Sequence, residues 1–165
     1  MHTAYIGLGS NIEPRREHIL NAIRSIGEVA KVIELSDIYE TKPVGFVDQP
    51  DFLNAVARVE TELGAIELWQ QFKSIERALG RQSRPRWHER EIDIDLLLFD
   101  DEIIDVTIDG NSLIVPHPEL HKRMFVLAPL AEIAPELQHP LLGASILELW
   151  RKCEQEAIHP PSWTE

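Results

Sequence analysis

The most restrictive feature of the sequence is a stretch at residues 92–98, in which aliphatic and acidic side chains alternate. Successive side chains of a β-strand point to opposite faces, so the pattern predicts a strand with Asp93 and Asp95 together on one face. The expected core face consists of Ile92, Ile94, Leu96 and Leu98. Aspartate is disfavoured in strands, and local propensity therefore does not explain the two carboxylates. We expect them to belong to a site.

The other apolar patterns extend this strand into an α+β fold. In chain order the expected elements are a strand at residues 3–9, a helix opened by Pro14, β-forming residues 31–40, a strand at 52–62, a helix at 66–79 and the strand at 92–98. This βαββαβ order predicts a ferredoxin-like core, with one largely antiparallel sheet and helices packed on one side of it. Short strands within 102–115, a short helix from Pro118 and a terminal helix at 146–153 are expected as C-terminal additions. Residues 154–165 are expected to form a loosely ordered tail.

Two neighbouring segments add polar and aromatic groups to this frame. Residues 41–51 contain two prolines and a glycine and predict a long loop, a kind of segment that often carries function. In the strand that follows, alternation buries one face and leaves the other to Phe52, Asn54, Val56 and Arg58.

Composition limits the kinds of partner that the protein can have. At 165 residues the chain has the size of one domain, which we expect to span residues 1–165. Its formal net charge of −12 opposes attraction to nucleic acid and to anionic membranes, so neither is an expected partner. The single cysteine, Cys153, cannot form an internal disulfide, and no segment has the pattern of a signal peptide or a membrane span. We expect a cytoplasmic protein, and a monomer.

An arginine-rich loop precedes the acidic strand. Residues 81–90 contain Arg81, Arg84, Arg86 and Arg90, with Trp87 among them. Guanidinium groups suit phosphate oxygens, and a carboxylate pair suits Mg²⁺, which itself binds phosphate oxygens. Loop and strand together predict a metal-assisted polyphosphate site. Three alternatives stay open, namely a solvated basic loop, a solvated acidic strand face, and a tryptophan that only anchors the core.

Other motifs exclude the common dinucleotide, P-loop and zinc sites. Residues 7–11 lack the third glycine of a dinucleotide fingerprint and are interpreted as a turn and helix cap, and the chain contains no P-loop. His117 and His121 lack the further ligands of a zinc site, so His117 is interpreted as a phosphate or hydroxyl partner. Lys73 and Glu76 have the spacing of an exposed ion pair on a helix.

Several ordered motifs together resemble the 6-hydroxymethyl-7,8-dihydropterin pyrophosphokinase family of folate biosynthesis. The segments that carry the resemblance are residues 7–11, 39–45, 48–55, 86–87, 90–99, 115–118 and 123–130. It extends from residue 3 to about residue 137. The resemblance implies an ATP-dependent pyrophosphokinase with a ferredoxin-like fold and additions, in agreement with the element order.

The resemblance also implies a reaction and a set of site residues. Pyrophosphate would pass from ATP, the co-substrate, to the hydroxymethyl group of 6-hydroxymethyl-7,8-dihydropterin, giving AMP and the pterin pyrophosphate. Two Mg²⁺ ions are implied on Asp93 and Asp95, which form the catalytic set with Arg81 and Arg90. The implied pterin site comprises Thr41, Pro43, Val44, Phe52, Asn54, Trp87 and Phe125. The implied ATP site comprises Lys73, Glu76, Arg81, Arg84, Trp87, Arg90, His117 and Arg123.

The chain departs from the family pattern at a few positions. Ser83 stands where a second loop arginine is usual, the dipeptide at 88–89 replaces a Gly-Pro, and Lys42 replaces a frequent proline. We expect Arg84 or Arg86 to substitute electrostatically for the missing arginine. These departures keep a second class open, a non-catalytic pterin- or nucleotide-binding module on the same ferredoxin-like frame.

Overall fold

The computed structural model describes residues 1–43, 48–85 and 88–158. Its centre is an antiparallel sheet in the order β2-β4-β1-β5, with β3 on the same edge of β4 as β2. The strands are β1 (His2–Ser10), β2 (Lys31–Leu35), β3 (Tyr39–Thr41), β4 (Phe52–Thr61) and β5 (Asp93–Phe99). This arrangement confirms the predicted α+β core.

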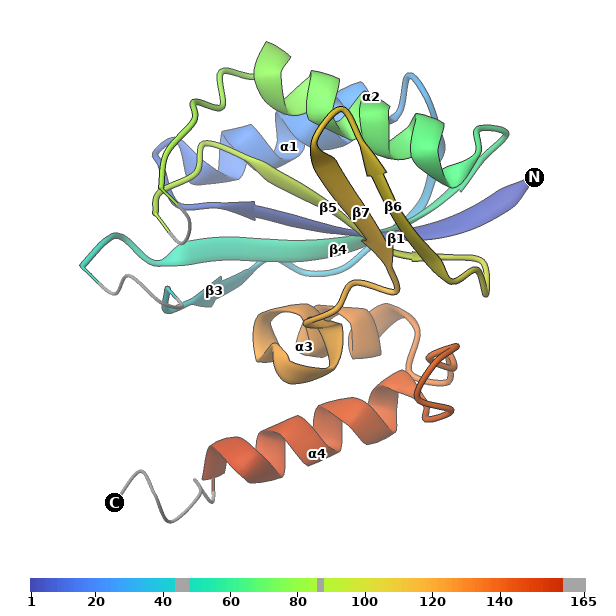
Figure 1. The fold of residues 1–165 in the computed structure, drawn as a ribbon. Helices are drawn as coiled ribbons and strands as arrows, with labels where there is room; N and C mark the ends of the chain where they lie inside the picture. The colour runs from blue at the N-terminus through green and yellow to red at the C-terminus, as the bar shows by residue number, and fades with distance from the viewer. Residues whose placement is uncertain (44–47, 86–87, 159–165) are drawn as a thin grey trace.

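Helices cover both sides of the sheet. The first pair, α1 (Arg15–Ile26) and α2 (Ala65–Ala78), lies on one side, and α3 (Met124–Ile133) and α4 (Ile146–Ile158) lie on the other (Figure 1). The prediction that the helices of the βαββαβ core lie on one side of the sheet is confirmed by α1 and α2, and the C-terminal additions supply the helices on the other side (Figure 1).

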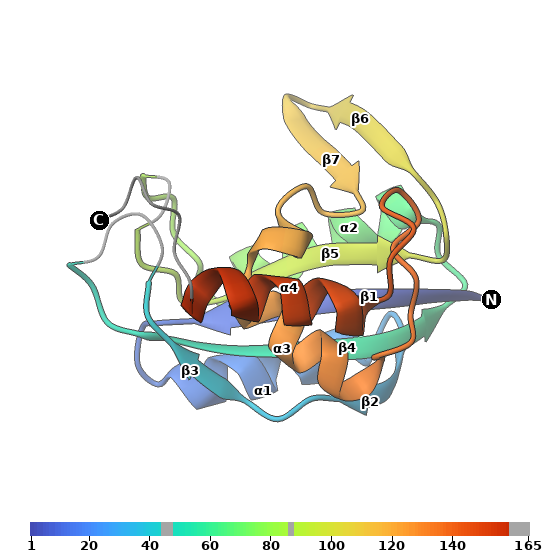
Figure 2. The ribbon, with the colours of Figure 1, turned by 90° about the horizontal axis from the view of Figure 1, so that it is seen from below.

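The chain between β5 and α3 adds a second, two-stranded sheet. It consists of an antiparallel hairpin, β6 (Ile104–Ile108) and β7 (Asn111–Val115), followed by the short 3-10 helix η1 (Leu120–Lys122). Figure 2 shows the hairpin projecting past β5 at the edge of the main sheet. None of the helices within the described ranges is long and apolar enough to cross a membrane.

The core consists of two apolar clusters separated by the sheet. The cluster beneath α1 and α2 contains Phe72 and Ile94, and the cluster beneath α3 and α4 contains Val56 and Leu127. The predicted alternation in β4 is confirmed, since Ala57 packs in the first cluster and Val56 in the second. The face of β4 that alternation left open is therefore covered in part by the C-terminal helices.

One irregularity changes the alternation in β5. The register with β1 shifts between Tyr5 and Ile6, which pair with Leu98 and Leu96 and leave Leu97 as an extra residue. Such a bulge reverses the side-chain alternation beyond it. Leu98 packs beneath α3 and α4, so its predicted place on the same core face as Leu96 is wrong.

The apolar stripe of α2 is also shifted slightly from the predicted one. Trp69, Phe72 and Ile75 are buried as predicted. Ile66 is 36% exposed, and Leu68 is fully buried in the stripe. The stripe determines which side of α2 faces the sheet. It therefore also determines which residues near the end of the helix face β5.

Candidate active site

The candidate site lies at the end of the sheet where β1 stops and β5 begins. Gly9 of β1 pairs with Asn54 of β4 on one side and with Asp93 of β5 on the other. Two residues earlier, Gly7 pairs with Asp95. Cross-strand partners have their side chains on the same face of the sheet, so the carboxylates and the amide face one space across a floor without side chains.

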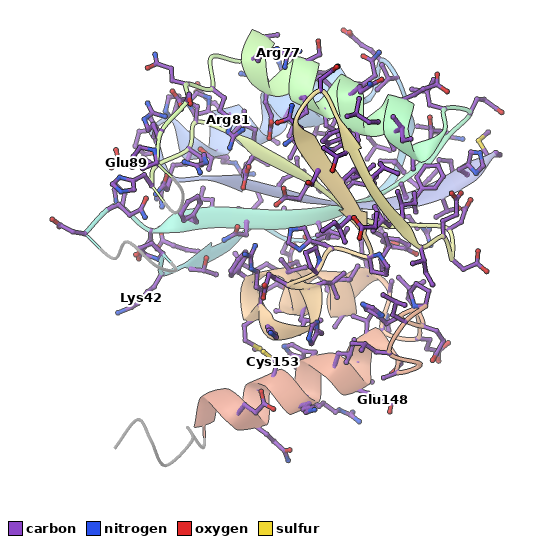
Figure 3. The ribbon with its side chains drawn as sticks, viewed as in Figure 1. Lys42, Arg77, Arg81, Glu89, Glu148 and Cys153 are labelled. Atoms are coloured by element: carbon purple, nitrogen blue, oxygen red, sulfur yellow. The ribbon has the colours of Figure 1, made fainter. Side chains whose placement is uncertain are left out.

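A cavity of about 210 Å³ opens over this floor. Its walls come from β4, the end of β3, the arginine-rich loop and the start of α3. The predicted site residues that line it are Thr41, Phe52, Asn54, Arg90, Asp93, Asp95, His117, Arg123 and Phe125. Figure 3 shows Lys42, Arg81 and Glu89 at the same end of the molecule.

The absence of a side chain at Gly9 leaves the space that the Asn54 carboxamide occupies. A Cβ atom at Gly9 would lie 3.0 Å from Oδ1 of Asn54 and 3.7 Å from the ring of Phe52. Asn54 donates a hydrogen bond from Nδ2 to Oγ1 of Thr41, 2.5 Å away. One fixed carboxamide beside one aromatic ring suits the edge and face of a flat heterocycle.

Asp93 and Asp95 are near enough to oppose each other's charge. Burial, and next the negative charge of Asp93, raise the pKa of Asp95 above its ordinary range. A divalent cation at the carboxylates would offset this repulsion. Mg²⁺ commonly binds through one or two carboxylates and fills its other positions with water and substrate phosphates. The pair therefore fits Mg²⁺.

The end of α2 places Arg81 beside the carboxylates. Gly80, with φ +93°, takes the left-handed conformation in which helices often end. The N–H of Gly80 donates to the carbonyl of Arg77 at 3.1 Å, and that of Arg81 to the carbonyl of Glu76 at 3.0 Å. The Arg81 guanidinium then lies 3.2 Å from Oε1 of Glu76 and 3.5 Å from Oδ1 of Asp93.

Glu76 is a buried residue, and its interpretation as half of an exposed ion pair is wrong. It is 2% exposed, and burial raises its pKa. Its Oε2 accepts the N–H of Ile94 at 2.7 Å, while its Oε1 lies 3.4 Å from Nζ of Lys73. Glu76 therefore connects α2 to the edge of β5 directly beside Asp93.

Arg84 is bound within the protein. Its guanidinium donates to both carboxylate oxygens of Glu91, with Nη2 3.1 Å from Oε2. This hydrogen bonding lowers the pKa of Glu91. A phosphate would have to compete with Glu91 for Arg84, so the replacement of the arginine missing at Ser83 stays a prediction. Arg86 lies outside the described residues.

Asn11 connects the two loops that border the cavity. It is 1% exposed, its Oδ1 accepts the N–H of Arg90 at 2.8 Å, and its own N–H donates to the Arg90 carbonyl at 3.1 Å. Its Nδ2 donates to Oε1 of Gln49 at 2.8 Å and to the carbonyl of Pro50 at 3.0 Å. The interpretation of residues 7–11 as a turn and helix cap is therefore wrong, since most of them belong to β1.

His117 and Arg123 line the cavity from the chain that leads into α3. Burial, and next the positive charge of Arg123, lower the pKa of His117 to about 4. The neutral ring accepts the N–H of Glu119 at Nδ1, 3.1 Å away, so its proton is on Nε2, which can donate. Arg123 precedes the first residue of α3, with its guanidinium carbon 5.5 Å from the centroid of the Phe125 ring. A cation and a helix N-terminus together favour an anion.

Comparison with known protein families matches residues 5–135 to 7,8-dihydro-6-hydroxymethylpterin-pyrophosphokinase (HPPK). The chain belongs to this family. A 2-amino-4-hydroxy-6-hydroxymethyldihydropteridine pyrophosphokinase of Aquifex aeolicus is 44% identical over 148 residues, which cover 90% of this chain and 90% of the relative. The protein of the same name from Bacillus subtilis is 44% identical over 167 residues, which cover 96% of this chain and 98% of the relative.

Solved structures of HPPK-DHPS proteins have the same fold. An HPPK-DHPS in complex with substrates has a TM-score of 0.78 at 16% identity, covering 96% of this chain and 45% of that one. The wild-type HPPK-DHPS of Plasmodium falciparum has a TM-score of 0.77 at 17% identity, covering 97% of this chain and 46% of that one. At these identities the likeness concerns the fold alone. This chain spans less than half the length of either structure.

HPPK membership confirms the family that the motifs predicted, while the roles of single residues stay predictions. Within the described residues, Pro43, Lys73, Glu76, Arg81 and Arg84 do not line the cavity, although Arg81 contacts Asp93. Val44 and Trp87 lie outside the described residues.

Sequence reasoning missed four residues that build this cavity and its borders. Gly7 and Gly9 form the floor, and glycine at alternate positions inside a strand is a recognisable signal of close approach. Asn11 and Glu91 hold the loop arginines through side-chain contacts, which leave no periodic pattern in the sequence.

Proposed function

We propose that this chain transfers the β,γ-pyrophosphoryl group of ATP to the hydroxymethyl oxygen of 6-hydroxymethyl-7,8-dihydropterin. The products are AMP and the pterin pyrophosphate, a step of folate biosynthesis. The observation that carries this proposal is the cross-strand row Asp93–Gly9–Asn54. It puts a site for phosphate-bound cations and a site for a flat polar ring on either side of one bare strand. Strands β4 and β5 lie on either side of β1, about 9.6 Å apart, so a pterin ring on the β4 side can direct its hydroxymethyl substituent towards phosphates on the β5 side.

The pterin ring binds between Phe52 and Phe125, with Asn54 and the backbone around residues 41–44 at its polar edge. The bond from Asn54 Nδ2 to Thr41 supports this role, because it leaves Oδ1 of the carboxamide as an acceptor for the ring's N–H groups. Phe52 and Phe125 both line the cavity, as the two faces of such a ring require.

The triphosphate binds at the β5 side of the floor, to Arg90, His117 and Arg123. Arg123 supplies charge at the start of α3, and Nε2 of the neutral His117 donates to a phosphate oxygen without adding charge. Asp93 and Asp95 would hold two Mg²⁺ ions, whose charge would stabilise the phosphate oxygens as negative charge develops during transfer. Arg81, 3.5 Å from Asp93, orients that carboxylate.

Catalysis by this chain rests on position and electrostatics. The pterin walls hold the hydroxymethyl oxygen in line with the β-phosphorus. The oxygen–phosphorus bond forms as the bond from the β-phosphorus to the α-phosphate oxygen breaks, which releases AMP, and the hydroxyl proton is released to water. Arginines preorganised around the phosphates stabilise the transition state in a site shielded from water.

The remaining parts of the proposal concern the whole protein. The chain acts in the cytoplasm as a monomer, as one domain, with ATP and the pterin as its partners. Its net charge of −12 supports the absence of nucleic acid and membrane partners, because the average surface repels both.

A direct assay tests the reaction. ATP, 6-hydroxymethyl-7,8-dihydropterin and Mg²⁺ are incubated with the protein, and AMP and pterin pyrophosphate are separated by chromatography. We expect equal amounts of the two products and no reaction in excess chelator. Binding of both ligands without AMP would instead establish the non-catalytic binding module, which the engagement of Arg84 by Glu91 favours as second candidate.

A further inference from the structure

A carboxylate at the end of α3 fastens this helix to the strand that borders the cavity. Glu132 accepts the hydroxyl of Tyr39 at Oε1, 2.5 Å away, and the N–H of Asp37 at Oε2, 3.0 Å away. Tyr39 is the first residue of β3, and Glu132 lies in the last turn of α3. Both oxygens of one side chain thus bind the same short segment.

The position of Glu132 is unfavourable for the helix itself. The C-terminal end of a helix carries partial negative charge, which disfavours a carboxylate there, and α3 has no basic residue in its last turn. The bonds to Tyr39 and Asp37 compensate for this placement. The phenol remains a donor at physiological pH, because hydrogen bonding to Glu132, and next burial, raise the pKa of Tyr39 to about 12.

This clasp, which consists of the bonds of Glu132 to Tyr39 and Asp37, joins β3 to α3, and both elements contribute residues to the lining of the cavity. Tyr39 pairs in register with Asn54, and β3 ends two residues later at Thr41, which accepts the hydrogen bond from Asn54. At the other end, α3 carries Phe125 at its start. α3 has ten residues, and although Pro129 removes one hydrogen bond inside it, the helix packs on the sheet as one body, so a restraint on its last turn also acts on its first. Glu132 does not line the cavity and can act only through these walls.

Apart from the clasp, β3 is held by its pairing with β4 and by the ion pair of Glu40 with Arg15 of α1, 2.8 Å apart. It is a three-residue strand at the edge of the sheet, and such short edge pairing opens easily. The segment before it is fixed at Ser36, whose N–H donates to the Val56 carbonyl at 2.9 Å and whose Oγ accepts the Val56 N–H at 2.9 Å. Between Ser36 and Thr41, the bonds of Asp37 and Tyr39 to Glu132 connect this segment to α3.

We propose that Glu132 and Tyr39 are a positioning pair, which sets the distance between the Asn54 wall and the Phe125 wall and so determines how tightly the pterin ring binds. The inference rests on the proposed function, since it names the control of the ring site in that reaction. Arg90 and the carboxylates of β5 belong to the triphosphate site and stand on elements that the clasp does not touch, whereas Arg123 of that site precedes α3, which the clasp holds. Loss of the clasp therefore weakens pterin binding more than ATP binding.

Steady-state kinetics with separately varied pterin and ATP test this separation. Tyr39→Phe removes one oxygen and keeps the ring, and Glu132→Ala removes both acceptors. We expect either variant to raise the pterin KM about tenfold, with the ATP KM and kcat within about twofold of the wild type. The double variant should be no worse than Glu132→Ala, because both changes break one connection. Glu132→Gln, which keeps an acceptor for the phenol, should recover part of the pterin affinity.

Glu136→Ala is the matched control, an exposed glutamate just beyond α3, and should leave both KM values unchanged. An unchanged pterin KM in Tyr39→Phe and Glu132→Ala would overturn the proposal. An equal rise of the pterin KM and the ATP KM would also overturn it, because it would show that the substitution disturbs the whole cavity. Pterin affinity is also measured directly from ligand fluorescence. If the wild type binds pterin and makes no AMP, the proposed reaction fails while the binding data still decide the role of the clasp.

Discussion

Glu91 binds the guanidinium of Arg84 through both of its carboxylate oxygens, in a pair whose acid side chain is 11% exposed. Arg84→Ala should therefore lower the free energy of unfolding, because it leaves the Glu91 carboxylate without its partner. Urea denaturation at pH 7 measures the change. Arg77→Ala, which removes an exposed arginine at the end of α2 (Figure 3), is the matched control and should change stability little.

The same pair has a defined pH dependence. Arg84 lowers the pKa of Glu91 below its ordinary value of 4.5, so the pair contributes stability above that value and loses it as the pH falls through the lowered pKa. The difference between wild type and Arg84→Ala should shrink in strong acid. A constant difference down to pH 2 would contradict this account.

Asp95→Asn should separate stability from activity. Burial and the charge of Asp93 raise the pKa of Asp95, so without metal its ionisation costs stability as the pH rises above the unfolded value of 3.8. In chelator at pH 8 the variant should therefore be the more stable protein, while with Mg²⁺ it should turn over at least about 10²-fold more slowly. Asp101→Asn, in the exposed turn after β5, is the control for both measurements.

Arg90 and Arg123 should matter for ATP rather than for folding. Alanine at either position should reduce kcat/KM for ATP at least about tenfold, since each would lose a charge-assisted bond to phosphate. Arg58→Ala is the control, because its guanidinium lies 3.6 Å from Glu34 at the surface, where ion pairs contribute little. Equal loss of ATP efficiency in all three variants would remove the phosphate role.

His117 should make the folded protein sensitive to mild acid. Its pKa is about 4 in the folded chain and 6.5 ordinarily, so the unfolded chain binds more protons between these values. Stability should therefore fall as the pH decreases from 6.5 towards 4. His117→Gln should remove this contribution to the pH dependence, which is about 3 kcal/mol over the interval. The melting temperature is measured as a function of pH for both proteins. The same dependence on pH in wild type and variant would show that the ring is not held neutral.

Gly9→Ala should weaken pterin binding more than Gly7→Ala. The new Cβ at Gly9 would lie 3.0 Å from Oδ1 of Asn54, whereas at Gly7 it would meet the flexible side chain of Leu97 at 3.5 Å. We expect at least about a tenfold loss of pterin affinity for the first variant, equal to about 1.4 kcal/mol, and a smaller loss for the second. Titration calorimetry with the pterin compares them, and the reverse ranking would exclude Asn54 as the displaced group.

The sequence predicted those parts of the molecule that follow a period. Alternation placed Asp93 and Asp95 on one face of β5 and Asn54 on the open face of β4, because the period of a strand is two residues. The bulge at Leu97 broke this rule for Leu98, and a bulge leaves no mark in a run of similar aliphatic residues.

Side-chain partnerships were the part that sequence reasoning could not supply. The burial of Glu76 depends on how the edge of β5 lies against α2, and helical spacing alone suggested an exposed pair with Lys73. Asn11 meets Arg90 across 79 positions of chain. Such contacts are decided by tertiary packing, which neither propensity nor periodicity describes.

The bare floor makes the activity depend on the pairing of β1. If β1 slipped by one residue against its neighbours, Leu8 and Ser10 would turn into the space that Gly7 and Gly9 leave open. The cavity would be filled, and the core would lose Leu8 in the same movement, since this residue is now 2% exposed. A chain with the wrong pairing would thus be both unstable and unable to bind substrate. A one-residue shift of β1 therefore does not give a well-folded but inactive protein.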